Sequence, residues 1–177
     1  MSVDFEILYF IQTLRSDWLD WIMTLITHLG DAGIFWILLS FILACKKETR
    51  LCGFTMMISL LLMQIIGNMV LKEIIARPRP CWLDDGIVLA IAEPESFSFP
   101  SGHTYSSFVC AVIILFFNKK WGAAALILAA LIAFSRMYLF VHFPSDILGG
   151  IVLGILTAFA AKWLSDKFVK NRLATKG

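Results

Sequence analysis

Apolar runs separated by short charged or Gly- and Pro-containing breaks make up most of this chain. The six runs cover residues 18–29, 32–45, 51–75, 104–117, 121–140 and 147–163. About 20 consecutive apolar residues form a helix long enough to cross the roughly 30 Å of hydrocarbon in a bilayer. The pattern therefore predicts an all-α protein, a polytopic membrane bundle of about six transmembrane helices that forms one domain over residues 1–177.

The amino-terminal part of this pattern is less regular than the rest. The runs at 18–29 and 32–45 are each shorter than a full crossing, and Gly30-Asp31-Ala32-Gly33 between them favours a turn. We therefore predict two spans there, with one tilted helix over both runs as the alternative. Ahead of them, residues 5–14 carry apolar positions among polar ones, which is typical of a helix lying in the membrane interface.

Composition indicates that the bilayer, and not water, is the solvent for this fold. Of the 177 residues, 59% are hydrophobic and only 16% are charged, which the core of a soluble domain of this size cannot absorb. The net charge of +2 and the lack of a basic stretch interleaved with aromatics exclude a nucleic-acid partner. The four cysteines have no C-x-x-C spacing, so neither a zinc site nor a redox pair is predicted.

The basic residues are distributed unevenly between the two ends of the predicted spans. With six spans and the amino terminus inside, four of the fifteen lie on the extracytoplasmic side: Lys72, Arg77, Arg79 and Arg136. The other eleven are Arg15, Lys46, Lys47, Arg50, Lys119, Lys120, Lys162, Lys167, Lys170, Arg172 and Lys176. Because cytoplasmic loops are enriched in Lys and Arg, the pattern predicts a multi-pass cell-membrane protein in this orientation, whose four exceptions need another explanation.

These exceptions gather with other polar side chains at one membrane face. The residues at the ends of the predicted spans there are Lys72, Arg77, Arg79, Ser101, Gly102, His103, Arg136, His142 and Asp146. Placing one cation near hydrocarbon costs about 2.5–3.5 kcal/mol, so several at one depth predict an anionic partner. Phosphate fits best, because Arg can hold two of its oxygens and a helix N-terminus such as that at Ser101 favours an anion. Ser101 alone could instead be a simple N-cap.

Two histidines and an aspartate at the same face supply groups that could cleave a phosphate ester. A neutral imidazole can attack phosphorus, a carboxylate can fix its tautomer, and a second imidazole can protonate the departing oxygen. This division of labour requires no metal and no other cofactor. A serine hydrolase using Ser101 is a weaker alternative, since the G-x-S-x-G pattern is absent.

Three motifs in this region match a known family. Residues 72–80 fit K-x6-R-P, residues 100–103 fit P-S-G-H, and residues 135–146 fit S-R-x5-H-x3-D. Together they resemble the signature of the type 2 phosphatidic acid phosphatase family, with the likeness spanning about residues 51–163. The resemblance implies His142 as nucleophile oriented by Asp146, and His103 as general acid. It also implies a phosphate site formed by Lys72, Arg79, Ser101, Gly102 and Arg136.

The sequence thus predicts a metal-independent membrane enzyme that hydrolyses a lipid phosphate through a phosphohistidine intermediate, with its site on the extracytoplasmic side. Small bacterial members act on undecaprenyl diphosphate, phosphatidylglycerophosphate or phosphatidic acid, and we favour the first. The alternative is a non-catalytic lipid-phosphate binder or transporter that uses the same cations. Arg77 has two interpretations, steering anionic headgroups or a plain interfacial position, and we expect an interfacial role for His28 and Asp31.

Overall fold

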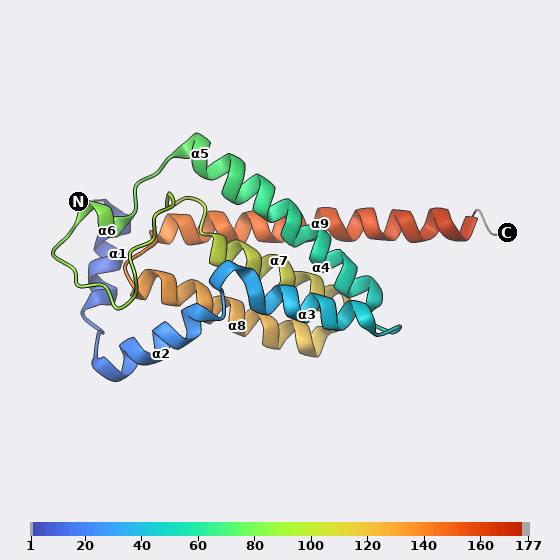
Figure 1. Cartoon of the computed structure of the whole chain (residues 1–177), viewed down its shortest axis with the longest axis horizontal. Helices are drawn as coiled ribbons and strands as arrows, with labels where there is room; N and C mark the ends of the chain where they lie inside the picture. Colours follow the sequence, from blue (N-terminus) through green and yellow to red (C-terminus); the bar gives the residue numbers. More distant parts are fainter. Residues whose placement is uncertain (1, 175–177) are drawn as a thin grey trace.

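The chain folds into an elongated bundle in which the longer helices run along one common direction (Figure 1). This computed structural model describes residues 2–174, and every regular element within them is helical, as predicted. In chain order, the elements are α1 (Val3–Gln12), α2 (Asp17–His28), the 3-10 helix η1 (Asp31–Gly33), α3 (Ile34–Cys45), α4 (Arg50–Met63), the π-helical segment η2 (Gln64–Leu71), α5 (Lys72–Ile75), α6 (Pro80–Leu83), α7 (Gly102–Phe117), α8 (Lys119–Tyr138) and α9 (Pro144–Ala174).

Helix α7 forms the centre of the bundle and packs mainly against α8, α9 and α4. Its Tyr105, Val109 and Ile113 are buried in one apolar cluster together with Trp36 from α3. Lipid tails are as apolar as these side chains, so close packing and not transfer from water holds such helices together. Gly154 permits one close approach, since a Cβ there would lie 2.9 Å from the Cβ of Phe108.

Four helical stretches of the described residues are long and apolar enough to cross a membrane. They are Asp17–Cys45, Arg50–Leu83, Lys119–Tyr138 and Pro144–Lys167. The central helix Gly102–Phe117 is apolar but shorter. The predicted membrane bundle is therefore confirmed in kind, while its count of six separate spans is not.

The difference in count arises in the first stretch. The runs at 18–29 and 32–45 correspond to α2 and α3, which follow one another along the bundle as two halves of a single broken stretch (Figure 1). The predicted turn exists, because Ala32 and Gly33 adopt φ angles of 48° and 68°. It breaks the helix without reversing the chain, so two separate spans are not confirmed here, and the alternative of one interrupted span is nearer the structure.

A helix does form near the predicted interfacial segment, but at the other end of the bundle from the one expected. Helix α1 lies across the end that also carries α6 and the loop at residues 84–101, which we call the α1 end (Figure 1). Arg15, placed by our prediction on the cytoplasmic side, lies at this end, where it pairs with Asp20 at 2.6 Å and donates to the Val88 carbonyl at 2.7 Å. Because the broken stretch Asp17–Cys45 passes along the bundle only once, the chain makes an odd number of passes, and its amino terminus lies at the end opposite to the one we predicted.

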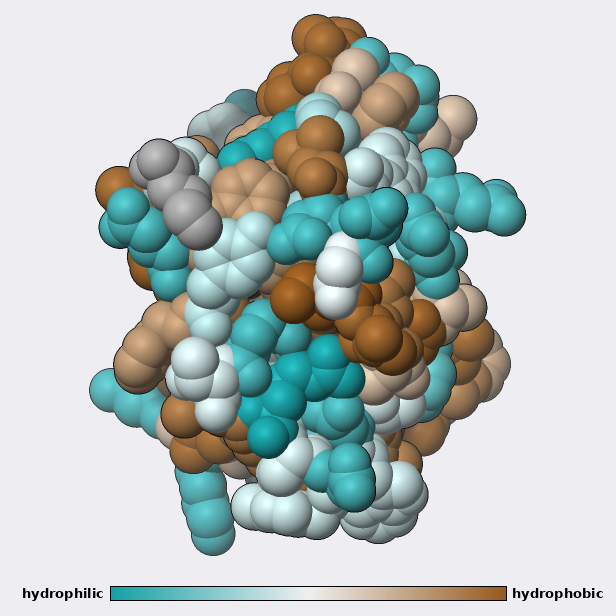
Figure 2. Space-filling model, turned by 90° about the vertical axis from the view of Figure 1, so that its left-hand side faces the viewer, coloured by the Kyte–Doolittle hydropathy of each residue, from teal (hydrophilic) through white to brown (hydrophobic). Residues whose placement is uncertain are grey.

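Seen from the α1 end, hydrophilic side chains gather above and below the centre of the surface, with a group of hydrophobic ones between them (Figure 2). The opposite end holds the turn between α3 and α4 and the break between α7 and α8 at Asn118. The loops that contain the predicted motifs all lie towards the α1 end, so any site they form opens there.

Candidate active site

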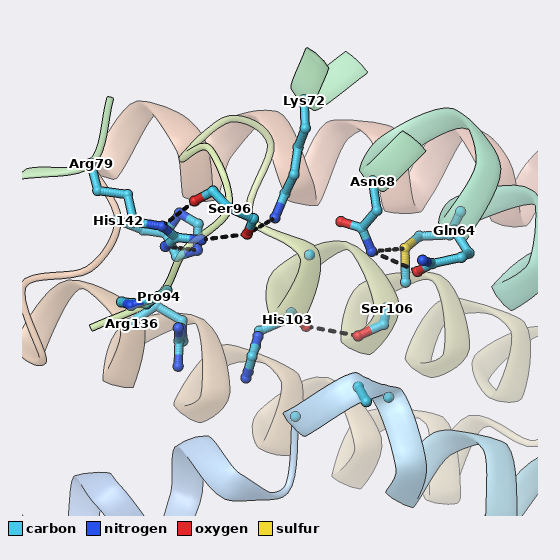
Figure 3. A pocket seen from close by; sticks show the side chains of 15 residues that line it. Gln64, Asn68, Lys72, Arg79, Pro94, Ser96, His103, Ser106, Arg136 and His142 are labelled. Atoms are coloured by element: carbon cyan, nitrogen blue, oxygen red, sulfur yellow. Dashed lines mark hydrogen bonds between the residues drawn. The ribbon is translucent and has the colours of Figure 1, made fainter. Parts of the chain in front are cut away.

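A cavity of about 310 Å³ lies near the α1 end, among η1, η2, the start of α7 and the end of α8. Six of the predicted site residues line it: Lys72, Arg79, Gly102, His103, Arg136 and His142. The other two, Ser101 and Asp146, are fully buried next to it. Figure 3 shows Lys72 and Arg79 pointing towards His142 from one side, with His103 and Arg136 across from Lys72. Folding therefore brings the three motifs to one place.

Local sequence fixes the positions of Lys72 and Arg79. Lys72 begins α5, the turn that follows η2 and ends the unbroken helix that starts at Arg50, and Ala76 ends this turn in the left-handed region at φ 46°. Pro80 occupies the first turn of α6 and restricts Arg79 before it to an extended backbone, observed at φ −80° and ψ 155°. The R-P pair thus directs the guanidinium towards the cavity (Figure 3).

Lys72, Arg79 and Arg136 are buried cations that have no carboxylate partner in the part of the chain that the structure describes. Their relative exposures are 7%, 2% and 4%. Lys72 Nζ and Arg79 Nη2 donate to the Ser96 hydroxyl at 3.0 and 3.2 Å, and Arg136 Nη1 donates to Thr27 Oγ1 at 2.6 Å. None of the three belongs to an ion pair within the described residues, and Arg136 Nε has no partner there. Unpaired buried charges are costly, so the cavity suits an anion.

The start of α7 contributes backbone groups rather than a serine nucleophile. The Ser101 hydroxyl caps the helix by accepting from Thr104 N at 3.5 Å and from Thr104 Oγ1 at 3.0 Å. It is fully buried, which leaves it unavailable for attack on an ester. Gly102 lines the cavity, where the free N–H groups of a helix N-terminus favour an oxyanion.

His142 is the buried base of the cavity, with 1% of its surface exposed. Its Nε2 lies 3.1 Å from Arg79 Nη1. Because a guanidinium only donates, Nε2 is the acceptor and the ring proton sits on Nδ1. Burial, and then the charges of Arg79, Arg136 and Lys72, lower the pKa of His142 well below its usual value. The ring is therefore neutral, with its lone pair directed at the cations.

Asp146 supports His142 through an intermediate residue that the sequence did not reveal. The distance from His142 Nδ1 to Asp146 Oδ2 is 3.6 Å, too long for a direct hydrogen bond. Ser98 lies between them, donating to Asp146 Oδ2 at 2.5 Å and lying 3.3 Å from His142 Nδ1. Its hydroxyl can accept from Nδ1–H while it donates to the carboxylate, which agrees with the tautomer assigned above.

Arg77 has a structural role that our two interpretations did not include. Its guanidinium pairs with Asp146 at 2.6 Å and with Asp4 of α1 at 2.7 Å, and it donates to the Ser145 hydroxyl at 2.7 Å. Burial raises the pKa of Asp4, but hydrogen bonds from Ser145 and Arg77 outweigh it and lower this pKa below its usual value. Arg77 thus neutralises the carboxylate behind His142 and ties helix α1 to it.

His103 faces the cavity from the first turn of α7. Its hydrogen-bond partner is Asp31, which we had not predicted as a site residue. Its Nε2 lies 2.9 Å from Asp31 Oδ1, and Asp31 Oδ2 lies 2.6 Å from His28 Nδ1. We expected an interfacial role for Asp31 and His28. Both side chains are about half exposed, and Asp31 has in addition a contact with His103 that the sequence did not predict.

The described residues contain no group of three or more His, Cys, Asp or Glu side chains that could hold a metal ion. The two carboxylates nearest the cavity, Asp31 and Asp146, each face a histidine or an arginine. The charged groups that could bind an anion in the cavity are the side chains of Lys72, Arg79 and Arg136. Whether the reaction proceeds without a metal stays a prediction.

Known proteins resemble this chain both in sequence and in structure. A family model described as PAP2 superfamily matches residues 50–170. Phosphatidylglycerophosphatase B of Bacillus subtilis (strain 168) is 33% identical over 90% of this chain and 81% of that protein. Undecaprenyl-diphosphatase BcrC of the same organism is 30% identical over 84% of this chain and 76% of that protein. A crystal structure of a transmembrane PAP2 type phosphatidylglycerolphosphate phosphatase from Bacillus subtilis superposes with a TM-score of 0.76 at 32% identity, covering 93% and 85% of the two chains.

Proposed function

Because this chain belongs to the PAP2 superfamily and is a phosphatase of that family, we propose that it cleaves phosphate from a membrane lipid through a phosphohistidine on His142. The observation that carries the proposal is the neutral, buried His142, whose Nε2 accepts from Arg79 in a cavity lined by three buried cations that have no carboxylate partner in the described structure. A protein that only binds lipid phosphate would need the cations but not a neutral nucleophile held by a carboxylate. The non-catalytic alternative therefore leaves His142 and Asp146 unexplained.

The proposed reaction has two steps that reuse the same groups. Lys72, Arg79 and Arg136 neutralise the phosphoryl oxygens, His142 Nε2 forms a bond to phosphorus, and the bond from phosphorus to the lipid oxygen breaks. His103 gives its proton to that oxygen, which leaves as the lipid alcohol or phosphate. Water then attacks phosphorus while His103 takes a proton from it, and inorganic phosphate and free His142 are released.

The support behind His142 suits both steps. Once Nε2 is bonded to phosphorus, Nδ1–H makes the ring cationic, and the negative charge of Asp146 stabilises it through Ser98. Arg77 holds the other oxygen of Asp146 at 2.6 Å, which orients the carboxylate and gives it a counter-charge. Asp146 and Ser98 thus act through His142 and do not contact the substrate themselves.

For the substrate we propose undecaprenyl diphosphate, with phosphatidylglycerophosphate and phosphatidic acid as the other candidates. The names of the relatives include enzymes for the first two. Phosphate release should be measured with purified protein against all three lipids in detergent or vesicles, with His142→Ala as the blank. Release from none of them, together with retained lipid binding, would favour the non-catalytic alternative.

Activity should persist in excess EDTA. The cations provide the charge neutralisation that a metal supplies in other phosphatases, so chelation should change the rate of phosphate release by less than about 2-fold. The measurement is kcat on the preferred lipid before and after dialysis against EDTA. Loss of nearly all activity, restored by magnesium, would contradict the metal-independent mechanism.

We propose further that the α1 end faces the outside of the cell. Excluding Lys176, which lies outside the described residues, nine basic residues belong to the opposite end and five to the α1 end: Arg15, Lys72, Arg77, Arg79 and Arg136. Four of the latter have a role at the site or beside it, so the excess of basic residues at the opposite end supports a cytoplasmic position for that end.

Single cysteines in a cysteine-free background test this orientation and the number of crossings together. Ser2→Cys and Glu95→Cys should both react with an impermeant reagent added to intact cells, and Lys120→Cys should not. All three positions are exposed. Labelling of Glu95→Cys but not Ser2→Cys would restore the six-span topology, and labelling of Lys120→Cys alone would place the reaction in the cytoplasm.

A further inference from the structure

The break between α2 and α3 is built around one side of His103. Gly30 lies directly against the ring, since a Cβ there would come within 2.5 Å of His103 Cδ2. Asp31 follows at the first position of η1 and reaches His103 Nε2 with Oδ1 at 2.9 Å. The two left-handed residues Ala32 and Gly33 then redirect the chain into α3. An interruption that wraps a reactive side chain in this way is a candidate for function, because it gives up helical hydrogen bonds inside a membrane-spanning stretch.

Asp31 is itself held from the other side. Its Oδ2 lies 2.6 Å from Nδ1 of His28, the last residue of α2. His28 and Asp31 have side-chain exposures of 58% and 48%, whereas that of His103 is 19%. The three side chains therefore form a row from the surface to the cavity, in which the carboxylate is fixed by two imidazoles.

The charges around His103 explain why a carboxylate is needed there. The cavity side presents Lys72, Arg136 and His142, and these come from α5, α8 and the turn before α9. A general acid must be protonated before it reacts, and an imidazolium among cations is disfavoured unless a negative charge contacts it. Among the described residues, Asp31 is the carboxylate within ion-pair distance of His103.

We propose that Asp31 is a positioning residue for His103, holding its Nε2–H, stabilising its protonated form and leaving Nδ1 to deliver the proton. The inference rests on the proposed function, in which His103 is the general acid. His28 orients Asp31 from the surface and acts one step further from the substrate. Neither residue contacts the reacting atoms.

The test compares Asp31→Asn on two substrates that differ in their need for an acid. On a lipid alkyl phosphate, kcat/KM should fall by about 10- to 100-fold, a part of the roughly 10²–10⁴ that a general acid contributes. On 4-nitrophenyl phosphate, whose phenolate leaves without a proton, the loss should stay below about 3-fold. Asp17→Asn is the matched control, because Asp17 is an exposed aspartate of the same stretch and the same change in charge should have no effect on either substrate.

Two further measurements separate positioning from a structural role. In a His103→Ala background, Asp31→Asn should cause no additional loss, since its effect passes through the missing ring. In the kcat/KM profile, Asp31→Asn should move the alkaline limb to lower pH, because an imidazolium without its counter-charge releases its proton sooner. His28→Gln should show the same preference for the alkyl substrate on a smaller scale, which provides the test if Asp31→Asn does not fold.

Equal losses for Asp31→Asn on both substrates, or additive losses with His103→Ala, would overturn the positioning role. The proposed function fails in a distinguishable way. If His103→Ala itself loses equally on both substrates, then His103 is not the acid, whatever Asp31 does. If His103→Ala discriminates between the substrates and Asp31→Asn does not, only the inference about Asp31 is lost.

Discussion

His142→Ala will abolish phosphate release from every substrate, with kcat/KM falling by about 10⁴-fold or more, as expected when a covalent nucleophile is removed. The neutral ring presents Nε2 to the cations that surround a bound phosphate, and no leaving group can compensate for a missing nucleophile. The measurement is single-turnover and steady-state phosphate release on a lipid phosphate and on 4-nitrophenyl phosphate. Lys120→Gln, at the opposite end of the bundle, is the control and should retain full activity.

A collapsed site would give the same loss of activity, so binding must be measured as well. His142→Ala keeps Lys72, Arg79 and Arg136, and titration with inorganic phosphate should therefore still show binding within about 10-fold of the unaltered protein. Arg79 loses one neighbour in this variant but keeps its contacts to Ser96 and Val141. Recovery of His142→Ala on the aryl ester would instead make it the acid and exchange the two histidine assignments.

His103→Ala will lose about 10²–10⁴ in kcat/KM on a lipid alkyl phosphate but recover most of its activity on 4-nitrophenyl phosphate. The contribution of a general acid depends on how strongly the departing oxygen needs a proton, and a phenolate leaves without one. The experiment compares both substrates at one pH with equal amounts of folded variant. Asp146→Asn should differ from it, with a smaller loss that is equal on both substrates, because Asp146 acts through the nucleophile.

Equal losses for His103→Ala on the two substrates would remove it from the acid role. The position of His103 across the cavity from Lys72 would then need another explanation, such as binding of a phosphoryl oxygen (Figure 3). A loss confined to KM would point in the same direction, since a residue that binds ground state and transition state equally does not change kcat.

Much of the site could be predicted because its residues lie in continuous motifs. Lys72 and Arg79 belong to one segment, and His142 with Asp146 belongs to another, so their spacing is visible in the sequence. Ser98 and Asp31 were not predicted as site residues for a physical reason. Each reaches its histidine only after the chain has folded, Ser98 from a loop without regular structure and Asp31 from a helix break distant in sequence.

The difference between the predicted and the observed topology has a similar origin. Hydropathy marks where apolar runs begin and end, but the 12-residue helices α2 and α3 have the same apolar character whether they fold back or continue. Whether the chain reverses or continues depends on the backbone conformation at Ala32 and Gly33. Both are left-handed, and because Ala32 is not a glycine its conformation could not be predicted from its residue type. Arg15 was then assigned to the wrong end, because the count of basic residues assumed an even number of crossings.

Helix α1 gives the amino-terminal segment a mechanical connection to the reaction centre. Asp4 holds both Arg77 and the amide and hydroxyl of Ser145, and Arg77 in turn holds the carboxylate of Asp146. A pull on α1 is therefore transmitted, through side chains alone, to the group that supports the nucleophile. A fusion partner or surface tether attached near residue 2 should for this reason lower the activity. Attachment at the opposite end of the bundle is the better choice for immobilising the enzyme.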